Sequence, residues 1–451
     1  MRPPSLLPCA VCLCALSCVE LVGVPTSDAA PDGTVARDAA RPGCLGPPRG
    51  EPGAIDGARS HWGRAAPWPA GLFPRGGAID PQGRALAFGF VLSADALDDA
   101  FVMRLLSNGE LDTAWADRGI ARVDGGEEGR PRRDVFLHGA VDAKGRVVAG
   151  GWTLSADAAS TYRGIVARFT ADGLPDRSFG RGGVATVAPR DSGFASYGSW
   201  IDGDEVLLVG AEGGNRLGAQ GYVMRVTGRG EADAAFGVAG AVAVAGTRVA
   251  RAALGDGDGY LVAIVATEPM GAALVRLRRD GSLDARFGVG GVLVHPRGQG
   301  VIPVSLLRQP DGALVVYGAY SPFAHQHEGA PTLVRFTPDG RPDLRYGEGG
   351  AVASREGLAV WLGASTATAA VQCDGAVLAL TLFGREAPLL QRFTPEGALD
   401  TRFGSVGRVF LPTLASGGVA YAVLPRSAEA SAVVLSAAPM PLVLGHHVVG
   451  L

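Results

Sequence analysis

Three kinds of residue recur along this chain at a spacing that never changes. An arginine is followed after eight residues by an aspartate, and the aspartate after three more by an aromatic residue. Six such triplets lie about 58 residues apart: Arg104, Asp112 and Trp115; Arg168, Asp176 and Phe179; Arg225, Asp233 and Phe236; Arg276, Asp284 and Phe287; Arg335, Asp343 and Tyr346; Arg392, Asp400 and Phe403. A period of this length indicates a chain built from repeated supersecondary units.

A second series of short polar turns runs in phase with the first. PQGR around Gly83, AKGR around Gly145 and PDGA around Gly312 each separate two apolar runs upstream of the arginine of their unit. A tight turn ending in glycine between apolar runs is a hairpin signal, because glycine accepts the positive φ that such turns need. Each unit therefore reads as four antiparallel strands, which is the pattern of a β-propeller blade.

The expected number of blades is seven. The tail, residues 415–451, contains three further apolar runs, and the missing fourth strand is sought at the other end of the chain, where Trp62-Gly63 imitates the aromatic-glycine pair of the repeat. The sequence thus predicts an all-β, seven-bladed propeller over residues 53–451. An N-terminal strand from Trp62 to Trp68 would close the ring and leave no bare sheet edge.

The repeated string resembles a known family. RFTADGLPDRSFGRGG from Arg168 and its five copies are similar to the delta-60 repeat of exported bacterial proteins, and the resemblance covers about 53–451. It implies a propeller-like domain and brings no agreed activity or catalytic residues. The sequence departs from the pattern at Ala116, where the other copies have glycine, and in the last unit, which lacks the arginine and the aspartate.

The N-terminal residues are typical of a bacterial secretion signal. Residues 1–18 begin with one arginine and continue with an apolar run too short to span a bilayer. Ala15-Leu16-Ser17-Cys18 resembles a lipobox, so Cys18 is the predicted lipidation site, with cleavage further on by an ordinary signal peptidase as the alternative. Residues 19–52 have the proline, glycine and small polar content of a disordered tether. The expected location is the outer envelope or cell surface, or otherwise the periplasm or medium.

The net charge excludes one class of partner, and the cysteine content bears on the state of two thiols. The net charge of −3 argues against nucleic acid as a partner, because nucleic-acid-binding surfaces carry a basic stripe. Outside the signal, Cys44 and Cys373 could form a disulfide, although an isolated buried thiol at Cys373 is the favoured interpretation. No cofactor motif is present, and no cofactor is expected.

The repeated triplet is interpreted as structural, because a catalytic constellation is needed once and this one occurs six times. Binding is expected instead in the connections that vary, namely those between the second and third strands and those between blades. One of these, 321–331, contains His325, His327 and Glu328, which could ligate a metal ion. With no third ligand at a diagnostic spacing, an ordinary polar loop is the favoured interpretation.

The predicted function is a non-catalytic, envelope-tethered scaffold. It would be a monomer that presents its variable loops to a protein or glycan partner and touches the membrane only through its lipid. The alternative is an exported propeller enzyme, a hydrolase or lyase acting on a polysaccharide, although no pair of carboxylates can be nominated for it.

Overall fold

All regular structure in the described residues is β-strand. The computed structural model describes residues 16–21, 71–91, 98–106, 109–125, 132–155, 161–189, 192–213, 219–321, 328–354, 359–360, 368–383, 387–410, 419–426 and 431–437. The strands are β1 (Leu16–Leu21), β2 (Leu72–Ile79), β3 (Ala85–Val91), β4 (Asp99–Leu105), β5 (Ile120–Val123), β6 (Arg132–Val141), β7 (Val147–Ser155), β8 (Tyr162–Phe169), β9 (Val184–Val187), β10 (Phe194–Asp202), β11 (Glu205–Glu212), β12 (Gly221–Val226), β13 (Ala241–Val244), β14 (Thr247–Asp256), β15 (Gly259–Thr267), β16 (Met270–Arg278), β17 (Val292–Gln299), β18 (Val301–Arg308), β19 (Leu314–Tyr320), β20 (Glu328–Phe336), β21 (Ala351–Ala353), β22 (Ala359–Val360), β23 (Ala369–Val371), β24 (Val377–Phe383), β25 (Ala387–Phe393), β26 (Arg408–Phe410), β27 (Val419–Arg426) and β28 (Ser431–Ala437). Within these ranges no helix is long and apolar enough to cross a membrane.

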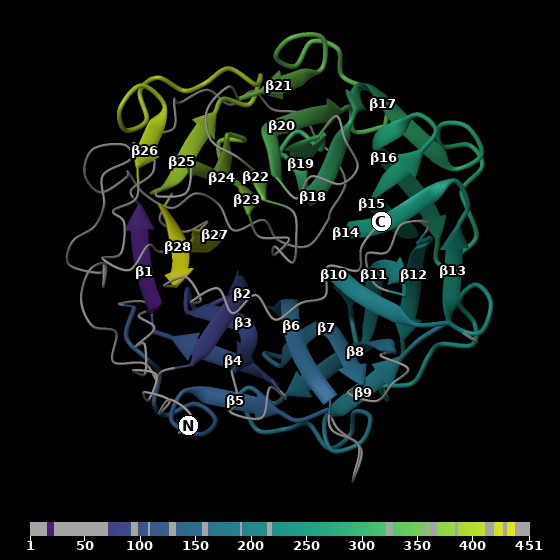
Figure 1. Cartoon of the computed structure of the whole chain (residues 1–451), viewed down its shortest axis with the longest axis vertical. Helices are drawn as coiled ribbons and strands as arrows, with labels where there is room; N and C mark the ends of the chain where they lie inside the picture. The colour runs from purple at the N-terminus through teal and green to yellow at the C-terminus, as the bar shows by residue number, and fades with distance from the viewer. Residues whose placement is uncertain are drawn as a thin grey trace, which may run out of the picture.

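The strands form six blades of four antiparallel strands around a central axis (Figure 1). Blade 1 is β2-β3-β4-β5, blade 2 β6-β7-β8-β9, blade 3 β10-β11-β12-β13, blade 4 β14-β15-β16-β17, blade 5 β18-β19-β20-β21 and blade 6 β23-β24-β25-β26, with the first strand of each nearest the axis; the short β22 pairs with β20. The predicted all-β propeller with four-stranded antiparallel blades is confirmed. The predicted number of seven is wrong, because the described strands form six four-stranded blades.

The remaining sheet has three strands in the order β1-β28-β27 and lies between blade 1 and blade 6 (Figure 1). Its outer strand among the described residues is β1, which spans the end of the predicted signal and the start of the predicted tether. The segment from Trp62 to Trp68, which was expected in this place, lies outside the described residues. The miscount has a physical reason. The last sequence unit has the apolar runs of a blade but lacks the arginine, aspartate and aromatic-glycine turn that lead into a fourth strand in the other six. The number of complete triplets, and not of apolar runs, matches the number of blades.

The core lies between neighbouring blades, because each sheet is apolar on both faces. Between blades 2 and 3, for example, Val166 and Phe179 pack with Phe194, Leu208 and Met224, and none of these side chains is exposed. A blade therefore buries its faces only against its neighbours, as expected of a repeat architecture.

A bulge bends the innermost strand in most blades. The pairing register slips by one residue near the middle of β2, β6, β10, β14 and β18, for instance between Phe136 and His138 and between Ser196 and Gly198. A bulge increases the local twist of a strand and re-aims the side chains beside it. Here it turns His138 of blade 2 toward blade 3, where its ring nitrogens contact the hydroxyls of Ser199 (2.8 Å) and Ser196 (2.9 Å).

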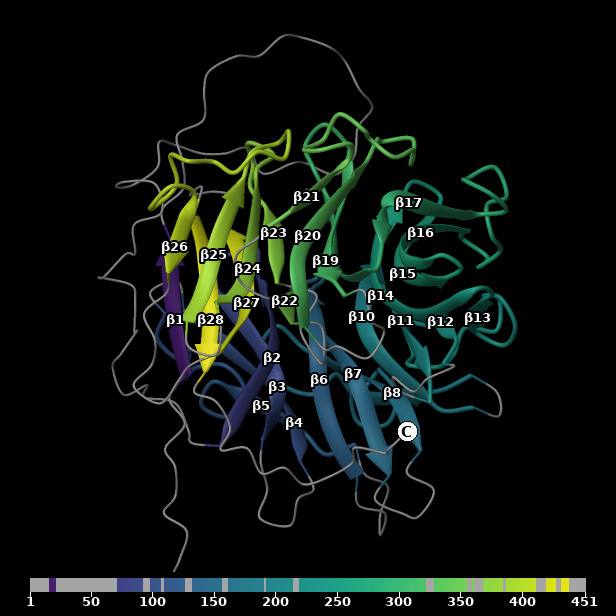
Figure 2. The ribbon, with the colours of Figure 1, turned by 45° about the horizontal axis from the view of Figure 1, so that its top comes forward.

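The connections divide between the two ends of the ring (Figure 2). The turns from the first to the second strand and from the third to the fourth lie at one end, called here the turn face. The second strand of each blade ends and the third begins at the other end of the ring, where the chain also passes from one blade to the next; this end is called the loop face. On the turn face the glycine that closes the third-to-fourth turn has φ between 82° and 91° in all six copies, which explains why glycine recurs there.

Candidate functional site

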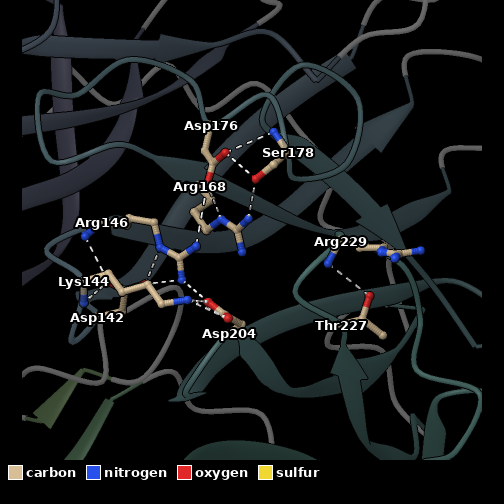
Figure 3. A network of polar contacts seen from close by, with 9 residues as sticks. All are labelled: Asp142, Lys144, Arg146, Arg168, Asp176, Ser178, Asp204, Thr227 and Arg229. Atoms are coloured by element: carbon tan, nitrogen blue, oxygen red, sulfur yellow. Dashed lines mark hydrogen bonds and ion pairs between the residues drawn. The ribbon is translucent and has the colours of Figure 1, made fainter.

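The repeated arginine and aspartate meet on the turn face (Figure 3). In blade 2 the Nε of Arg168 donates to the Asp176 carboxylate at 2.8 Å, and the backbone N–H of Ser178 donates to the other Asp176 oxygen at 3.0 Å. The guanidinium of Arg168 lies 4.6 Å from the centre of the Phe179 ring, which is fully buried. One arginine thus contacts both other members of the triplet, through a charge-assisted hydrogen bond and a cation-π contact.

The other copies keep the ion pair with one exception. The ion pairs are Arg104–Asp112 at 2.8 Å, Arg225–Asp233 at 2.6 Å, Arg335–Asp343 at 2.5 Å and Arg392–Asp400. In blade 4 the nearest distance between Arg276 and Asp284 is 3.9 Å, and Arg276 pairs at 3.0 Å with Asp256 instead. The Arg276 side chain is also 39% exposed, so the pair is weakest in this blade.

In four copies the residue after the aromatic links its blade to the next one. Its backbone N–H donates to a carbonyl in the following blade's third-to-fourth turn, and we call this link the clasp. The clasps are Ala116 to Asp172 (2.8 Å), Gly180 to Arg229 (2.7 Å), Gly237 to Asp280 (2.8 Å) and Gly347 to Glu396 (2.9 Å). Ala116 adopts a φ of +50°, close to the +52° of Gly180, so the departure from glycine at this position leaves the turn unchanged.

The aromatic ring fills the space below the next blade's turn. A Cβ added to Gly340 would lie 2.0 Å from the Phe287 ring, and one added to Gly173 would lie 2.5 Å from the Trp115 ring. The indole N–H of Trp115 also donates to the carbonyl of Ala171 in blade 2 at 3.1 Å. Glycine is therefore required in that turn by the neighbouring blade's ring as well as by its own φ.

Ion pairs between first-to-second-strand turns extend this network, and sequence reasoning missed them (Figure 3). Arg146 pairs with Asp142 of its own turn at 2.6 Å and reaches Asp204 of blade 3, which also receives Lys144 at 2.7 Å. Hydrogen bonds from Lys144 and Arg146 lower the pKa of Asp204 to about 2. The available signal was an aspartate four residues before an arginine in the same turn, which occurs at Asp142 and again at Asp80.

Burial and pairing act in opposite directions on the pKa of Asp176. Partial burial alone would raise it, but the hydrogen bonds from Ser178 and the charge of Arg168 outweigh burial and hold the pKa below its ordinary value. The charges of Arg168 and Asp176 are thus directed at one another. We retain the structural role of the triplet as a prediction, tested in the Discussion.

A buried carboxylate lies between blades 1 and 2, toward the loop face. Asp134 at the start of β6 is fully buried and accepts the N–H of Gly125 at 2.5 Å. Its own backbone N–H donates to the carbonyl of Asp98 at 2.7 Å, and the Asp98 carboxylate pairs with Arg133 at 2.8 Å. Burial raises the pKa of Asp134 to about 6, although the Gly125 hydrogen bond acts to lower it.

The loop face carries an open cavity of about 440 Å³ between blades 3 and 4. Its lining residues are Ala219, Gln220, Gly246, Thr247, Arg248, Thr267 and Met270. They come from the start of β12, the turn between β13 and β14, and the turn between β15 and β16. Sequence reasoning placed binding on this face in general but missed the cavity, because three segments distant in sequence form it.

Some of the remaining predicted site residues lie outside the described residues. His325 and His327 fall there, and Glu328 is the first residue of β20. Within the described ranges, no group of three or more histidine, cysteine, aspartate or glutamate side chains could hold a metal ion. Cys18 lies in β1, opposite Leu435. Cys373 is disulfide-bonded, so the interpretation as an isolated thiol is wrong.

Comparison with solved structures gives distant likenesses. They include a puromycin hydrolase (14% identity, TM-score 0.45, covering 78% of this chain and 49% of that chain) and a putative 6-phosphogluconolactonase from Bacteroides fragilis (13%, 0.38, 88% and 98%). A third is a subtype N10 neuraminidase-like protein of A/little yellow-shouldered bat/Guatemala/060/2010 (12%, 0.36, 65% and 91%). This chain spans about half the length of the first. Identities and TM-scores this low carry no argument about activity.

Comparison with the curated proteins finds no match. Comparison with family models finds one, a domain of unknown function (DUF5122) described as a β-propeller, which matches residues 145–179 and 309–345. The first match runs from the Gly145 turn of blade 2 to Phe179, and the second lies in blade 5 and ends just before Tyr346. Two of the six repeats of this chain thus match the model of a propeller repeat family.

Proposed function

We propose that this protein is a non-catalytic, exported propeller of delta-60 repeats that presents its loop face to a glycan or protein partner at the bacterial envelope. The observation that carries the proposal is the difference between the two faces. On the turn face, the described arginines and aspartates of the repeat are engaged with one another within and between blades. On the loop face, an open cavity presents polar side chains to solvent.

Two matched tryptophan substitutions test whether the loop face is the binding face. Ala245 and Ala235 are both exposed in blade 3, Ala245 in the turn that borders the cavity and Ala235 in a turn on the opposite face. Ala245→Trp should abolish binding to an array of envelope glycans or to a purified envelope partner, because the indole covers the cavity. Ala235→Trp should bind like the parent protein.

Equal binding by both variants would show that the loop face is not the binding face.

The alternative function, an exported enzyme acting on a polysaccharide, has one observation in its favour. Asp134 has its pKa raised toward the range of a general acid, although its side chain is fully buried. Release of new reducing ends from a glycan bound by the parent protein would favour the enzyme over the scaffold.

Attachment to the envelope is proposed to run through a lipid on Cys18. Cleavage before Cys18 would leave four residues of β1, Cys18 to Leu21, in the mature chain. Cys18→Ala is expected to accumulate as an uncleaved precursor, because the lipidated cysteine is the first residue of a mature lipoprotein. Mass spectrometry of the N-terminus checks this prediction, and a mature chain beginning near Pro31 without an acyl group would contradict it.

A further inference from the structure

The cavity between blades 3 and 4 contains one positive charge that is not neutralised from within. Arg248 is half-buried in its wall. Among the residues that the structure describes, Arg248 has no hydrogen-bond acceptor, carboxylate or aromatic ring in contact. This distinguishes it from Arg104, Arg168 and Arg225, which each pair with the aspartate of their repeat.

The other polar groups of the cavity suit a ligand that both donates and accepts hydrogen bonds. The hydroxyl of Thr247 donates to the carbonyl of Val244 at 2.6 Å, and that of Thr267 donates to the carbonyl of Gly246 at 3.0 Å. Both hydroxyl protons are engaged, so each oxygen is left as an acceptor. The carboxamide of Gln220, which has no partner within the described ranges, offers two donors and an acceptor.

The shape and charge of the cavity restrict the chemical class of the ligand further. Ala219 and Met270 pack on the inner apolar cluster, so part of the wall is apolar. No acidic side chain lines the cavity, and Glu268, in the turn between β15 and β16, is exposed and is not part of the lining. The volume falls at the small end of the range for ligand sites, about 300 to 1,000 Å³. These features suit a small ligand that carries one negative charge and bears several hydroxyls beside an apolar face.

We propose that this cavity binds a carboxylated sugar residue of an envelope or environmental glycan, with the carboxylate on Arg248. Gln220, Thr247 and Thr267 would hydrogen-bond the sugar hydroxyls, and Met270 would lie against the C–H face of the ring. The proposal rests on the proposed binding function of the loop face and specifies its ligand. Uronic and sialic acids share this chemistry.

The test measures binding of glucuronate, galacturonate and N-acetylneuraminate to the purified protein by calorimetry or ligand-observed NMR, with galactose and inorganic phosphate as comparison ligands. At least one carboxylated sugar should bind about tenfold more tightly than galactose, and the affinity should fall with added salt. Which acid binds best separates the two sources of the ligand. A preference for inorganic phosphate, or equal affinity for galactose, would overturn the proposal.

Three variants test whether the carboxylate of the ligand binds to Arg248. Arg248→Gln should weaken binding of the preferred acid at least about tenfold, as expected for the loss of a charge-assisted hydrogen bond. Arg248→Lys should restore part of the loss, because it keeps the charge but not the bidentate fork. The control is Arg229→Gln, at an exposed side chain on the turn face, which should bind like the parent protein. Parent-like affinity of Arg248→Gln would refute the assignment.

Failure of this inference differs from failure of the proposed function. If the protein bound a neutral glycan and Ala245→Trp abolished that binding, the loop face would be right and the carboxylated ligand wrong. If no carboxylated sugar bound and Ala245→Trp still bound an envelope partner like the parent protein, both the carboxylated ligand and the loop face would be wrong. The melting midpoints of the variants at Ala245, Ala235, Arg248 and Arg229 should match that of the parent, since none of these side chains belongs to the packed core.

Discussion

Asp400→Ala is expected to lower the free energy of unfolding by about 3 to 5 kcal/mol, the cost of removing one partner from a buried ion pair. The side chains of Asp400 and Arg392 are only 3% and 2% exposed. Without Asp400, the Arg392 guanidinium keeps Gln372 and Asp374 as partners but stays buried with part of its charge uncompensated. Thermal and denaturant unfolding, compared by midpoint with the parent protein, measure the effect.

The same substitution in two other blades serves as a graded control. Asp176→Ala should cost less, because the Asp176 side chain is 14% exposed and Arg168 keeps a hydrogen bond to Ser178. Asp284→Ala should cost least, because Arg276 is partly exposed and already pairs with Asp256. The sequence alone suggests a uniform cost of about 1 to 3 kcal/mol, the usual range for losing a hydrogen-bonded or paired group. Three variants that melted like the parent, one of them without ligand binding, would identify a site and not a structural repeat.

Asp134→Asn is expected to stabilise the protein at pH 7 and to have little effect near pH 4. The pKa of Asp134 is raised to about 6 by burial, so the fold favours the protonated carboxyl. The stability that this group contributes is complete below its unfolded pKa of about 4 and is lost as the pH rises through 6. Asparagine stays neutral and can still accept the Gly125 N–H. At about 1.4 kcal/mol per pKa unit, the gain at pH 7 should approach 3 kcal/mol.

The measurement is the difference in melting midpoint between variant and parent at several pH values. The parent's own profile would not isolate Asp134, because two buried histidines act in the opposite sense. Burial lowers the pKa of His138 to about 3 and that of His295 to about 4, so their contribution is lost as the pH falls below about 6.5. A constant difference between Asp134→Asn and the parent from pH 4 to pH 8 would show that Asp134 does not titrate in this window.

The repeat was readable from sequence because it is local. The arginine, aspartate and aromatic of one copy lie within twelve residues, and the turns between them need particular residues, so both spacing and composition carry the signal. The clasp was not readable, since it joins backbone groups of two copies and depends on no particular side chain. The cavity was hidden for a similar reason: Gln220, Arg248 and Met270 have no shared pattern and meet only because blades 3 and 4 are adjacent.

The number of blades could not be derived from hydrophobic runs. Apolar alternation predicts strands, and it did so correctly at Val419–Arg426 and Ser431–Ala437. It does not say which sheet a strand joins. Residues 16–18 were assigned to a secretion signal and residues 19–21 to a tether, yet together they form β1 and pair with β28. Edge pairing depends on which strand reaches the edge, and local sequence does not encode that.

The clasp has a consequence for how the chain can be divided. Every observed link runs in the same direction, from the aromatic turn of one blade to a carbonyl in the blade that follows, as Gly180 does to Arg229. A fragment cut at a blade boundary therefore loses the turn of the following blade that packs on its last aromatic ring. Its first blade loses only the backbone N–H that the preceding blade donates to a surface turn. The two ends of such a fragment are therefore unequal, and we expect a fragment to be more stable when it is extended by one blade at its C-terminal end than at its N-terminal end. Grafting or duplicating units of this ring should respect that polarity.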